Sequence, residues 1–488
     1  MTMLSESTLS RLAPHVKVPD YNRADVRVGI VHIGVGAFHR SHEALYVDML
    51  LADDPQWGIC GVGVRGADAP TRDALVPQGG LYTLTTVDPQ GGEEVRAVGS
   101  IVRYLHAPDD TEAVLKQMSD PAVRIVSLTI TEGGYGIDDA TGEFTPVDDA
   151  TRADMAGAEV PTSAFGLIAE ALRRRRRSGH APFTVLSCDN VQHNGRVART
   201  ALLAVAEAMD PELAMWIAEN VAFPSSMVDR ITPGTTDDVR RAVALDTGVE
   251  DRWPVRAESF LQWVLEDDFP AGRPEWESAG AQLVKDVQPY ELMKLRLLNA
   301  SHQVMSYPAL LAGLTWVDDA CHDEQIVALV EGWMREARNT LEPVPGVDLD
   351  EYCTDLIARF GSAAVRDTLA RQVVSSSDRI PKFIVPVLID GIDRPPNRYG
   401  LFALASWGVW IADALVTEGA YVTDARLPEL LAAARREEAG AESAMLDIEA
   451  IFGQLGRVPE VREEYWQYRT AIREQGVRPA LAALLAVS

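Results

Sequence analysis

The chain has 488 residues, of which 47% are apolar and 24% charged, a composition typical of a globular protein with more than one core. Its 72 acidic and 45 basic residues give a net charge of −27, which argues against nucleic acid and anionic membranes as partners. The four cysteines are far apart and include no C-x-x-C pair, which argues against disulfides and a structural zinc site and favours a cytoplasmic location.

The first clear pattern in the chain is a strand, a glycine turn and a helix. Residues 26–33 are apolar and rich in β-branched side chains, which predicts a buried strand, and residues 41–51 are predicted to be helical. Between them, Gly34 permits a tight turn and Gly36 lets the backbone approach a pyrophosphate. His39 stands where the usual third glycine falls, so an ordinary strand–helix turn is the alternative. The predicted cofactor contacts of this turn are Ile33, Gly34, Val35, Gly36, Ala37 and Phe38.

A second predicted strand, residues 57–64, ends in two charged residues that bear on the choice of cofactor. An acidic residue at this place, here Asp68, typically binds the ribose hydroxyls of NAD. Arg65 would instead suit the 2′-phosphate of NADP, so both cofactors stay open. The alternative is that both residues are solvated turn residues.

Polar residues follow two later strands. Further strands are predicted at 81–87, 95–102, 123–131 and 183–188. The third runs into Glu132, and the fourth into a segment that contains Asp189 and Asn190. Open α/β sheets bind ligands beyond the carboxyl ends of their strands, so we expect these side chains near a ligand. A surface loop and an Asx-rich turn are the alternatives.

Two later segments complete the first half of the chain. Residues 163–176 are predicted to form a helix with Ser163 as N-cap, and the arginines that close it, 173–177, suit a solvated helix C-terminus. In residues 223–233, Asp229 and Arg230 are candidate functional charges, with a structural ion pair as the alternative.

Residues 291–306 carry the densest set of candidate catalytic side chains. The run is rich in strong helix formers, so we predict a helix. At about 100° per residue, Glu291, Lys294 and His302 fall within roughly 80° of arc, and Asn299 lies about 60° beyond His302. Burial on this apolar face lowers the pKa of a Lys towards the working range of a general base. A core helix with polar residues at its rim is the alternative.

The chain changes character near residue 286. After it, nine segments are predicted to be helical and one short strand is possible at 383–388, so we predict an α-helical second domain. The predicted domains are therefore 1–285, an α/β dinucleotide-binding domain, and 286–488, a helical domain. We predict that residues 371–382 gather three cations around a turn. We see no apolar run of membrane-spanning length and no signal peptide.

Six stretches together resemble one family, the mannitol 2-dehydrogenase group of polyol-specific long-chain dehydrogenases. They span most of the chain, and the K-x(4)-N-x(2)-H run is the specific signal among them. The stretches are residues 34–42 (GVGAFHRSH), 131–135 (TEGGY), 188–190 (CDN), 223–233 (FPSSMVDRITP), 294–302 (KLRLLNASH) and 378–382 (DRIPK).

The resemblance implies a metal-independent, nicotinamide-dependent oxidoreductase with a Rossmann-like N-terminal domain and a helical C-terminal domain. It would interconvert D-mannitol and D-fructose with NAD, or with NADP. A reductase of a sugar acid such as fructuronate, a D-arabinitol dehydrogenase and a non-catalytic dinucleotide sensor are the alternatives. We expect a monomer.

The resemblance also implies a role for each candidate residue. Lys294 would be the catalytic acid/base. Asn190 and Asn299 would form an oxyanion hole, and His302 and Asp229 would bind or orient the substrate. Glu291 and Glu132 would serve proton transfer and its gating. Arg371 and Arg379 resemble the cationic substrate contacts of the family; the second is commonly a Lys, which makes Lys382 an alternative to it.

Overall fold

The structure is a computed structural model that describes residues 2–138, 141–363, 367–392 and 397–486. It consists of two compact units, Met1–Gln288 and Pro289–Ser488, which are described one after the other.

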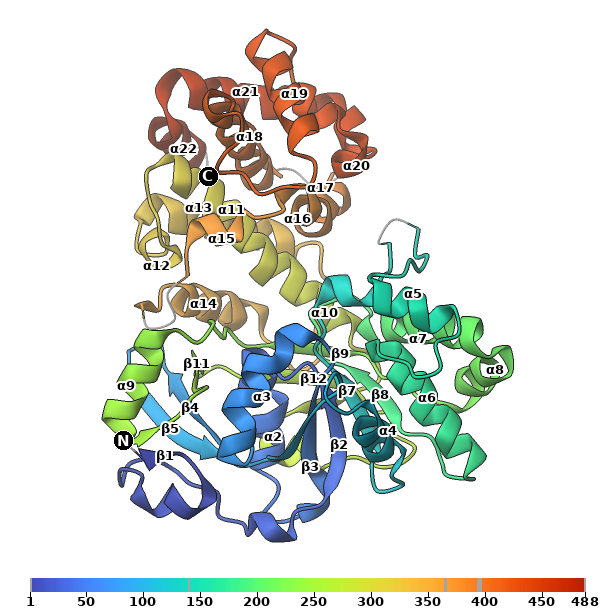
Figure 1. The fold of residues 1–488 in the computed structure, drawn as a ribbon. Helices are drawn as coiled ribbons and strands as arrows, with labels where there is room; N and C mark the ends of the chain where they lie inside the picture. Colours follow the sequence, from blue (N-terminus) through green and yellow to red (C-terminus); the bar gives the residue numbers. More distant parts are fainter. Residues whose placement is uncertain (1, 139–140, 364–366, 393–396, 487–488) are drawn as a thin grey trace. The chain divides into compact units, whose positions relative to one another are not determined.

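Unit 1 is built on a five-stranded parallel sheet with the strand order β6-β3-β2-β7-β8 (Figure 1). Because all neighbours are parallel, the carboxyl ends of the strands meet at one edge of the sheet. This order is the one in which a Rossmann-type fold places its first five strands, and it confirms the predicted fold class. The strands are β2 (Val28–Ile33), β3 (Gly58–Gly63), β6 (Ile101–His106), β7 (Ile125–Leu128) and β8 (Thr184–Ser187).

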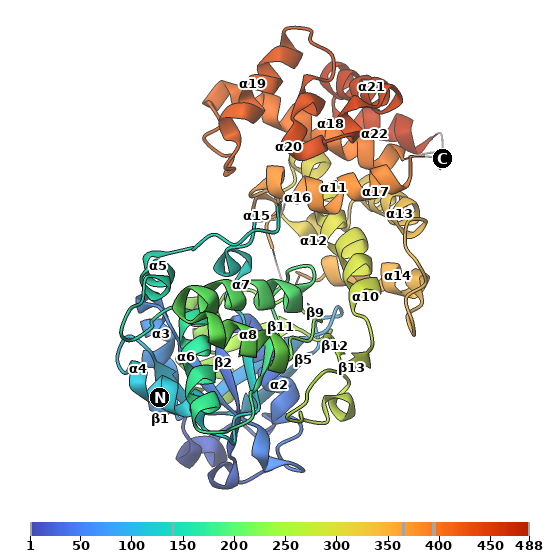
Figure 2. The same ribbon diagram turned by 90° about the vertical axis from the view of Figure 1, so that its right-hand side faces the viewer.

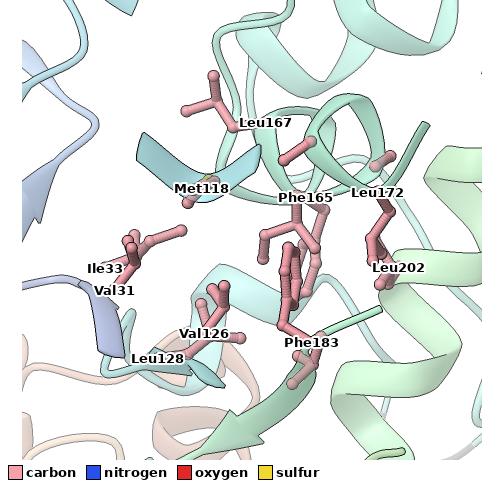
Figure 3. Close-up of a cluster of buried hydrophobic side chains, with 14 of the residues drawn as sticks. Val31, Ile33, Met118, Val126, Leu128, Phe165, Leu167, Leu172, Phe183 and Leu202 are labelled. Atoms are coloured by element: carbon pink, nitrogen blue, oxygen red, sulfur yellow. The ribbon is translucent and has the colours of Figure 1, made fainter. Parts of the chain in front are cut away.

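Alternate residues of these strands face two separate hydrophobic cores, as the pleat of a strand requires. Val31 and Ile33 pack, with Val126 and Leu128, against the helices α4 (Thr111–Ser119), α6 (Ala164–Arg177) and α7 (Asn194–Met209) (Figure 3). Ile30 faces the opposite core, which also receives α2 (Glu43–Asp48).

Smaller sheets and short helices complete unit 1. One sheet has the order β11-β4-β5, from Val255–Glu258, Tyr82–Val87 and Glu93–Val98. A second has the order β13-β12-β9, from Gln282–Val284, Gln262–Glu266 and Ser226–Asp229. A two-stranded sheet pairs β1 (Thr2–Met3) with β10 (Val249–Glu250). The remaining α-helices are α1 (Ala37–Ser41), α3 (Ala69–Leu75), α5 (Asp149–Met155), α8 (Pro211–Asn220) and α9 (Asp237–Thr247).

Several local predictions for unit 1 hold and others are wrong. Ser163 caps α6 as predicted, because its side chain accepts a hydrogen bond from the Gly166 amide. The predicted strand 95–102 is two strands, β5 and β6, separated at residues 99–100. The predicted helix 41–51 is interrupted at His42, whose φ and ψ of −118° and −97° end α1 before α2 begins. Helices α3, α4, α5, α8 and α9 were not predicted.

Unit 2 is helical, as predicted. Its central helix is α18 (Arg398–Asp413), which is buried from Tyr399 to Ala412 and packs against α11, α13, α19 and α21 (Figure 2). Its other α-helices are α10 (Gln288–Met293), α11 (Ala300–Leu311), α12 (Val317–Ala320), α13 (Glu324–Arg338), α14 (Leu349–Phe360), α15 (Leu369–Gln372), α16 (Ser376–Phe383), α17 (Val385–Asp390), α19 (Leu427–Glu438), α20 (Glu449–Phe452), α21 (Pro459–Gln475) and α22 (Val477–Leu485).

One prediction for unit 2 is wrong. The possible strand at 383–388 is helical, because residues of α16 and α17 occupy it. The three cations of residues 371–382 lie on the two helices that flank the turn at residues 373–375: Arg371 on α15, and Arg379 and Lys382 on α16. The predicted helix 362–374 includes residues 364–366, which lie outside the described part of the chain.

One helical stretch among the described residues, Arg398–Thr417, has the length and composition needed to cross a membrane. In its most apolar window 78% of the residues are buried inside the protein, as in the core helix of a globular unit. Asp413 falls within this stretch, which explains why the sequence shows no uninterrupted apolar run.

Candidate functional site

The glycine turn after β2 has the shape that a dinucleotide needs. Gly34 has a φ of 95°, and a Cβ there would lie 2.1 Å from the carbonyl oxygen of Thr129, so a side chain is excluded. Gly36 faces open space, because the nearest atom to a Cβ would be 3.9 Å away. This turn therefore leaves room for a close backbone approach by a pyrophosphate, and the residues present fit the predicted cofactor.

Asp68 organises the turn after β3. It ends the 3-10 helix Gly66–Asp68, and its Oδ2 accepts hydrogen bonds of 2.9 Å from the amides of both Val64 and Arg65. Its side chain is 18% exposed, whereas that of Arg65 is 66% exposed. The carboxylate thus shapes the loop, and its contact with the ribose of a dinucleotide stays a prediction.

Asp189 brings the ends of β7 and β8 together. Its two carboxylate oxygens accept hydrogen bonds of 2.9 Å from the amides of Ile130 and Thr131, and its Oδ2 accepts one of 2.6 Å from the Tyr135 hydroxyl. The bound segment leads directly into Glu132, and Asp189 itself precedes Asn190. The two predicted site residues therefore belong to loops that one carboxylate joins.

Burial changes the pKa of both Asp189 and Tyr135. It raises the pKa of Asp189 above its ordinary value, although the bonds from Tyr135 and the backbone oppose the effect. Burial, followed by the nearby Asp189 charge, also raises the pKa of Tyr135 well above its usual range, so this hydroxyl stays a donor. No role was assigned to Asp189 from the sequence, although its position directly after a buried strand was a signal for one.

Asn194 joins the start of a third strand, β9, to the same loops. Its Nδ2 donates hydrogen bonds to the carbonyls of Asp189 at 3.0 Å and Ser226 at 2.7 Å, and its Oδ1 accepts one of 2.9 Å from the Ser226 amide. Ser226 begins β9, and Asp229 ends this strand in a buried position. Asn194 therefore links the Asn190 loop to the strand that carries Asp229.

Arg230 has a structural role. Its buried guanidinium donates hydrogen bonds to the carbonyl oxygens of Ser41 and Glu258, which ties α1 to β11. Of the two charges considered in residues 223–233, Asp229 is thus the one that stays a candidate for substrate binding.

In unit 2 the predicted catalytic helix contains a π-helix. The chain is helical from α10 through α11, and Lys294–Asn299 between them is a π-helix. A π-turn holds more residues than an α-turn, so the angles predicted at 100° per residue are wrong between Lys294 and His302. Such π-helical turns are frequent at functional sites. The helix also continues through Pro308, beyond its predicted end.

The polar residues of this helix are largely withdrawn from water. Glu291 is 5% and Lys294 8% exposed. Within the described part of the chain, Asn299 Nδ2 and His302 Nδ1 are buried without a hydrogen-bond partner. Buried polar atoms normally have partners, so an amide donor and a ring nitrogen left without one indicate a place for polar groups of a ligand.

His302 is neutral at neutral pH. Burial lowers its pKa to about 4, an effect that Asp367 opposes and that the nearby cations, led by Arg371, increase. Its ring centroid lies 4.3 Å from that of Phe360. A neutral imidazole can both donate and accept a hydrogen bond, which suits it to a hydroxyl.

The two predicted cationic contacts already have protein partners. Arg371 forms a two-pronged pair with Asp367, in which Nε donates to Oδ1 at 2.7 Å and Nη2 contacts Oδ2. Arg379 donates through Nη1 to the Gln372 carbonyl at 2.8 Å. Asp367 lies four residues before Arg371, a spacing at which side chains meet on a helix. This spacing could have revealed Asp367 as the partner of Arg371 from the sequence.

Among the described residues, one group of three side chains offers metal-ligating atoms within 4.8 Å of one another: His32, His39 and Glu43. All three are buried in unit 1. The group was not predicted from the sequence, because its members belong to three different elements, β2, α1 and α2. The absence of a catalytic metal stays a prediction.

Comparison with known proteins identifies the family of the chain. Residues 28–278 match the model of the mannitol dehydrogenase Rossmann domain, and residues 286–472 match that of the mannitol dehydrogenase C-terminal domain. Together these matches cover most of the chain.

Individual relatives agree with the domain matches. Mannitol 2-dehydrogenase of Phaeosphaeria nodorum is 43% identical over 458 residues, which are 92% of this chain and 80% of that protein. Polyol:NADP oxidoreductase of Gluconobacter oxydans is 45% identical over 384 residues, 78% of this chain and 79% of that protein. The solved structure of Pseudomonas fluorescens mannitol 2-dehydrogenase in a ternary complex with NAD and D-mannitol matches over 100% of both chains, with 40% identity and a TM-score of 0.88. The chain therefore belongs to the mannitol dehydrogenase family of oxidoreductases.

Proposed function

We propose that this protein is an NAD-dependent mannitol 2-dehydrogenase, which converts D-mannitol to D-fructose and back. In the forward direction the secondary alcohol loses a hydride from carbon and a proton from oxygen, and NAD⁺ accepts the hydride when it is bound. The observation that carries the proposal is the helix of unit 2, on which a buried Lys294 accompanies the unpartnered donor of Asn299 and the unpartnered ring nitrogen of His302.

Lys294 is the general base of the proposed reaction. In its neutral form the amine takes the proton from the substrate hydroxyl, and in the reverse direction the ammonium returns it. Burial favours the neutral amine that this role needs. Glu291 lies three residues before Lys294 on the same helix and is suited to pass the proton onwards. Glu132, on the loop after β7, is proposed to gate this transfer.

Neutral amides stabilise the developing alkoxide in this proposal. Asn299 and Asn190 each offer an N–H donor to the oxygen as it loses its proton, and one such donor typically contributes about 10²–10³ in rate. A neutral donor has an advantage over a second cation, because a cation would repel the ammonium that Lys294 becomes when it takes the proton. Asp229 and His302 are proposed to bind other hydroxyls of the polyol chain.

The pairing of Arg371 favours a neutral polyol over a sugar acid. A sugar-acid substrate needs a cation that faces its carboxylate, ideally through the paired donors of a guanidinium. Here Asp367 already occupies two donors of Arg371. The Arg371–Asp367 pair is therefore better suited to hydroxyl groups, which accept from one partner and donate to the other.

The charge at the end of β3 favours NAD over NADP. Asp68 places a carboxylate where the 2′-phosphate of NADP would carry negative charge. Arg65 is largely exposed, and its Nη2 lies 3.6 Å from the Asp68 carboxylate, which reduces its attraction for a phosphate. We also propose that the protein is a cytoplasmic monomer, which light scattering during gel filtration would test.

The deciding experiment is an absorbance assay at 340 nm on the purified protein. Mannitol, sorbitol and arabinitol are offered with NAD⁺ or NADP⁺, and fructose and fructuronate with NADH or NADPH. We expect the highest kcat/KM for mannitol and fructose with NAD, unchanged after dialysis against a chelator. Higher activity with fructuronate would refute the substrate assignment. Binding of NADH without turnover of any compound would indicate a non-catalytic sensor.

A further inference from the structure

A buried polar cluster lies behind the glycine turn of unit 1. It consists of His32 on β2, His39 on α1, Glu43 on α2, Ser127 on β7 and Thr129 just beyond β7, and is called the His32 cluster below. His32 is 0% exposed, and His39 and Glu43 are each 1% exposed. Titratable groups are seldom buried so completely without a purpose, and the proposed reaction uses none of the three.

The hydroxyl of Thr129 connects this cluster to the glycine turn. Its Oγ1 donates a hydrogen bond of 2.6 Å to the carbonyl oxygen of Gly34, and His32 Nε2 lies 2.9 Å from the same Oγ1. A hydroxyl has a single proton. Because Thr129 gives that proton to Gly34, it must accept one from His32, so the Nε2 atom of His32 is protonated.

The other ring nitrogen of His32 is held by Ser127 and Glu43. Ser127 Oγ lies 2.8 Å from His32 Nδ1 and 2.9 Å from Glu43 Oε2, and Glu43 Oε2 lies 2.9 Å from His32 Nδ1. These contacts fix the orientation of the His32 ring, and with it the direction in which Nε2 points.

His39 completes the surroundings of His32. Its ring stacks on that of His32, with centroids 3.5 Å apart and an interplanar angle of 14°. Burial lowers the pKa of His39 well below its ordinary value, so the His39 ring is neutral. A neutral ring can lie flat on that of His32 and hold it in place.

The orientation of the Gly34 carbonyl determines where the next amide points. The carbonyl and the following N–H of a trans peptide point in opposite directions. With its oxygen held by Thr129 on the side of the His32 cluster, the peptide directs the N–H of Val35 away from that cluster. Backbone N–H groups of such a turn are the donors that bind a pyrophosphate.

We propose that His32 is a positioning residue for the dinucleotide, which fixes the Gly34–Val35 peptide through Thr129. The inference rests on the proposed use of a nicotinamide dinucleotide. A metal ion at His32, His39 and Glu43 fits the geometry less well. Nearly parallel stacked rings direct their nitrogen lone pairs side by side and not towards one point, and His32 Nδ1 already faces Ser127.

Dissociation constants for NADH test this role, measured by fluorescence titration of the full-length protein. Thr129→Val keeps the side-chain shape but removes the link, and it is expected to raise the Kd about three- to tenfold, the effect of one net hydrogen bond. Thr129→Ser restores the hydroxyl and should stay within about twofold of the wild type. Thr184→Val is the matched control, since this buried hydroxyl of β8 has no hydrogen-bond partner in the described part of the chain. An unchanged Kd for Thr129→Val would refute the positioning role.

Two further measurements separate this inference from its alternatives. In protein labelled with [¹⁵N]histidine, His32 is assigned by the signal lost in His32→Gln, and its Nε2 should carry a proton at neutral pH. An Nε2 without a proton would refute the link to Thr129. Stoichiometric zinc in the dialysed protein, lost in His39→Ala, would refute the positioning role and indicate a metal site. If the wild type binds neither NADH nor NADPH, the proposed function fails, whereas the NMR result still decides whether His32 donates to Thr129.

Discussion

Asp189 holds Thr131 in a backbone conformation that the β-branched side chain of Thr131 disfavours. Thr131 has a φ of 68°, in the left-handed region that a β-branched residue rarely adopts, and its amide donates a hydrogen bond of 2.9 Å to the Asp189 carboxylate. Such a conformation costs on the order of 1 kcal/mol or more and persists where its surroundings enforce it. The next residue is Glu132, so the strained backbone determines where this proposed gating carboxylate lies.

Asp189→Asn should reduce turnover more than cofactor binding. The amide keeps one acceptor oxygen, but its NH₂ group must face a backbone N–H or the Tyr135 hydroxyl, which leaves a buried donor unsatisfied. We expect about a tenfold fall in kcat, a loss of about 1–3 kcal/mol in the free energy of unfolding, and a Kd for NADH within about twofold of the wild type. Steady-state kinetics and urea unfolding measure these effects. Tyr135→Phe removes a single bond to Asp189 and should have a smaller effect on kcat; an unaltered kcat in Asp189→Asn would contradict the role.

Lys294→Met should abolish most of the activity without loosening the cofactor. Methionine keeps the apolar stem but offers no base, so kcat is expected to fall by about 10²–10⁴ while the Kd for NADH stays the same. Lys285→Met, at an exposed position before the helix, is the matched control and should retain full activity. A kcat near that of the wild type in Lys294→Met would show that another group removes the proton.

The sequence allowed the main sheet and most helices to be predicted, because their signals are local. The apolar run of β2 and the cap at Ser163 each lie within a few consecutive residues. The run 95–102 misled because the largely apolar end of β5 and the apolar start of β6 are separated only by the short turn at 99–100. The run 383–388 misled because full burial makes a helix as apolar as a strand.

The parts of the site that escaped prediction depend on distant residues. The π-helix Lys294–Asn299 consists largely of residues that also favour an α-helix, so no residue type in it distinguishes the wider turn. The His32 cluster joins side chains from β2, α1, α2 and β7. Similarly, the carboxylate of Asp189 was visible in the sequence, but its bonds to Ile130 and Thr131 span almost 60 residues.

Asp68→Ala should weaken the binding of NAD more than that of NADP. The substitution removes the negative charge that suits a free ribose and opposes a 2′-phosphate, so the ratio of kcat/KM for NAD to that for NADP should fall at least about tenfold. It also removes the acceptor for the amides of Val64 and Arg65. Asp68→Asn keeps an acceptor for this loop and removes only the charge, so it separates the two effects. An unchanged ratio in both variants would place the determinant of cofactor choice elsewhere.

Glu336→Gln should make unit 2 more stable at alkaline pH. Glu336 accepts a hydrogen bond of 3.4 Å from the amide of Tyr399 in the first turn of the buried helix α18, and its Oε2 is buried without a hydrogen-bond partner among the described residues. Burial raises the pKa of Glu336 from 4.5 to about 8, against the opposing effect of the helix amides. Because the pKa of Glu336 is higher in the folded than in the unfolded state, its protonated form stabilises the fold. This contribution to the free energy of unfolding is complete below about pH 4.5. It is lost as the pH rises through about 8, at about 1.4 kcal/mol for each pH unit between these two values.

Glutamine keeps the hydrogen bond to the helix but does not ionise, so this loss should disappear. Calorimetric melting at pH 6 and pH 9 measures it, and Glu331→Gln, at an exposed position of α13, corrects for the change in net charge. We expect Tm to fall between pH 6 and pH 9 by clearly less in Glu336→Gln than in the wild type or in Glu331→Gln. Equal falls in all three proteins would mean that Glu336 is already ionised at pH 6, and that the amides of α18 outweigh its burial.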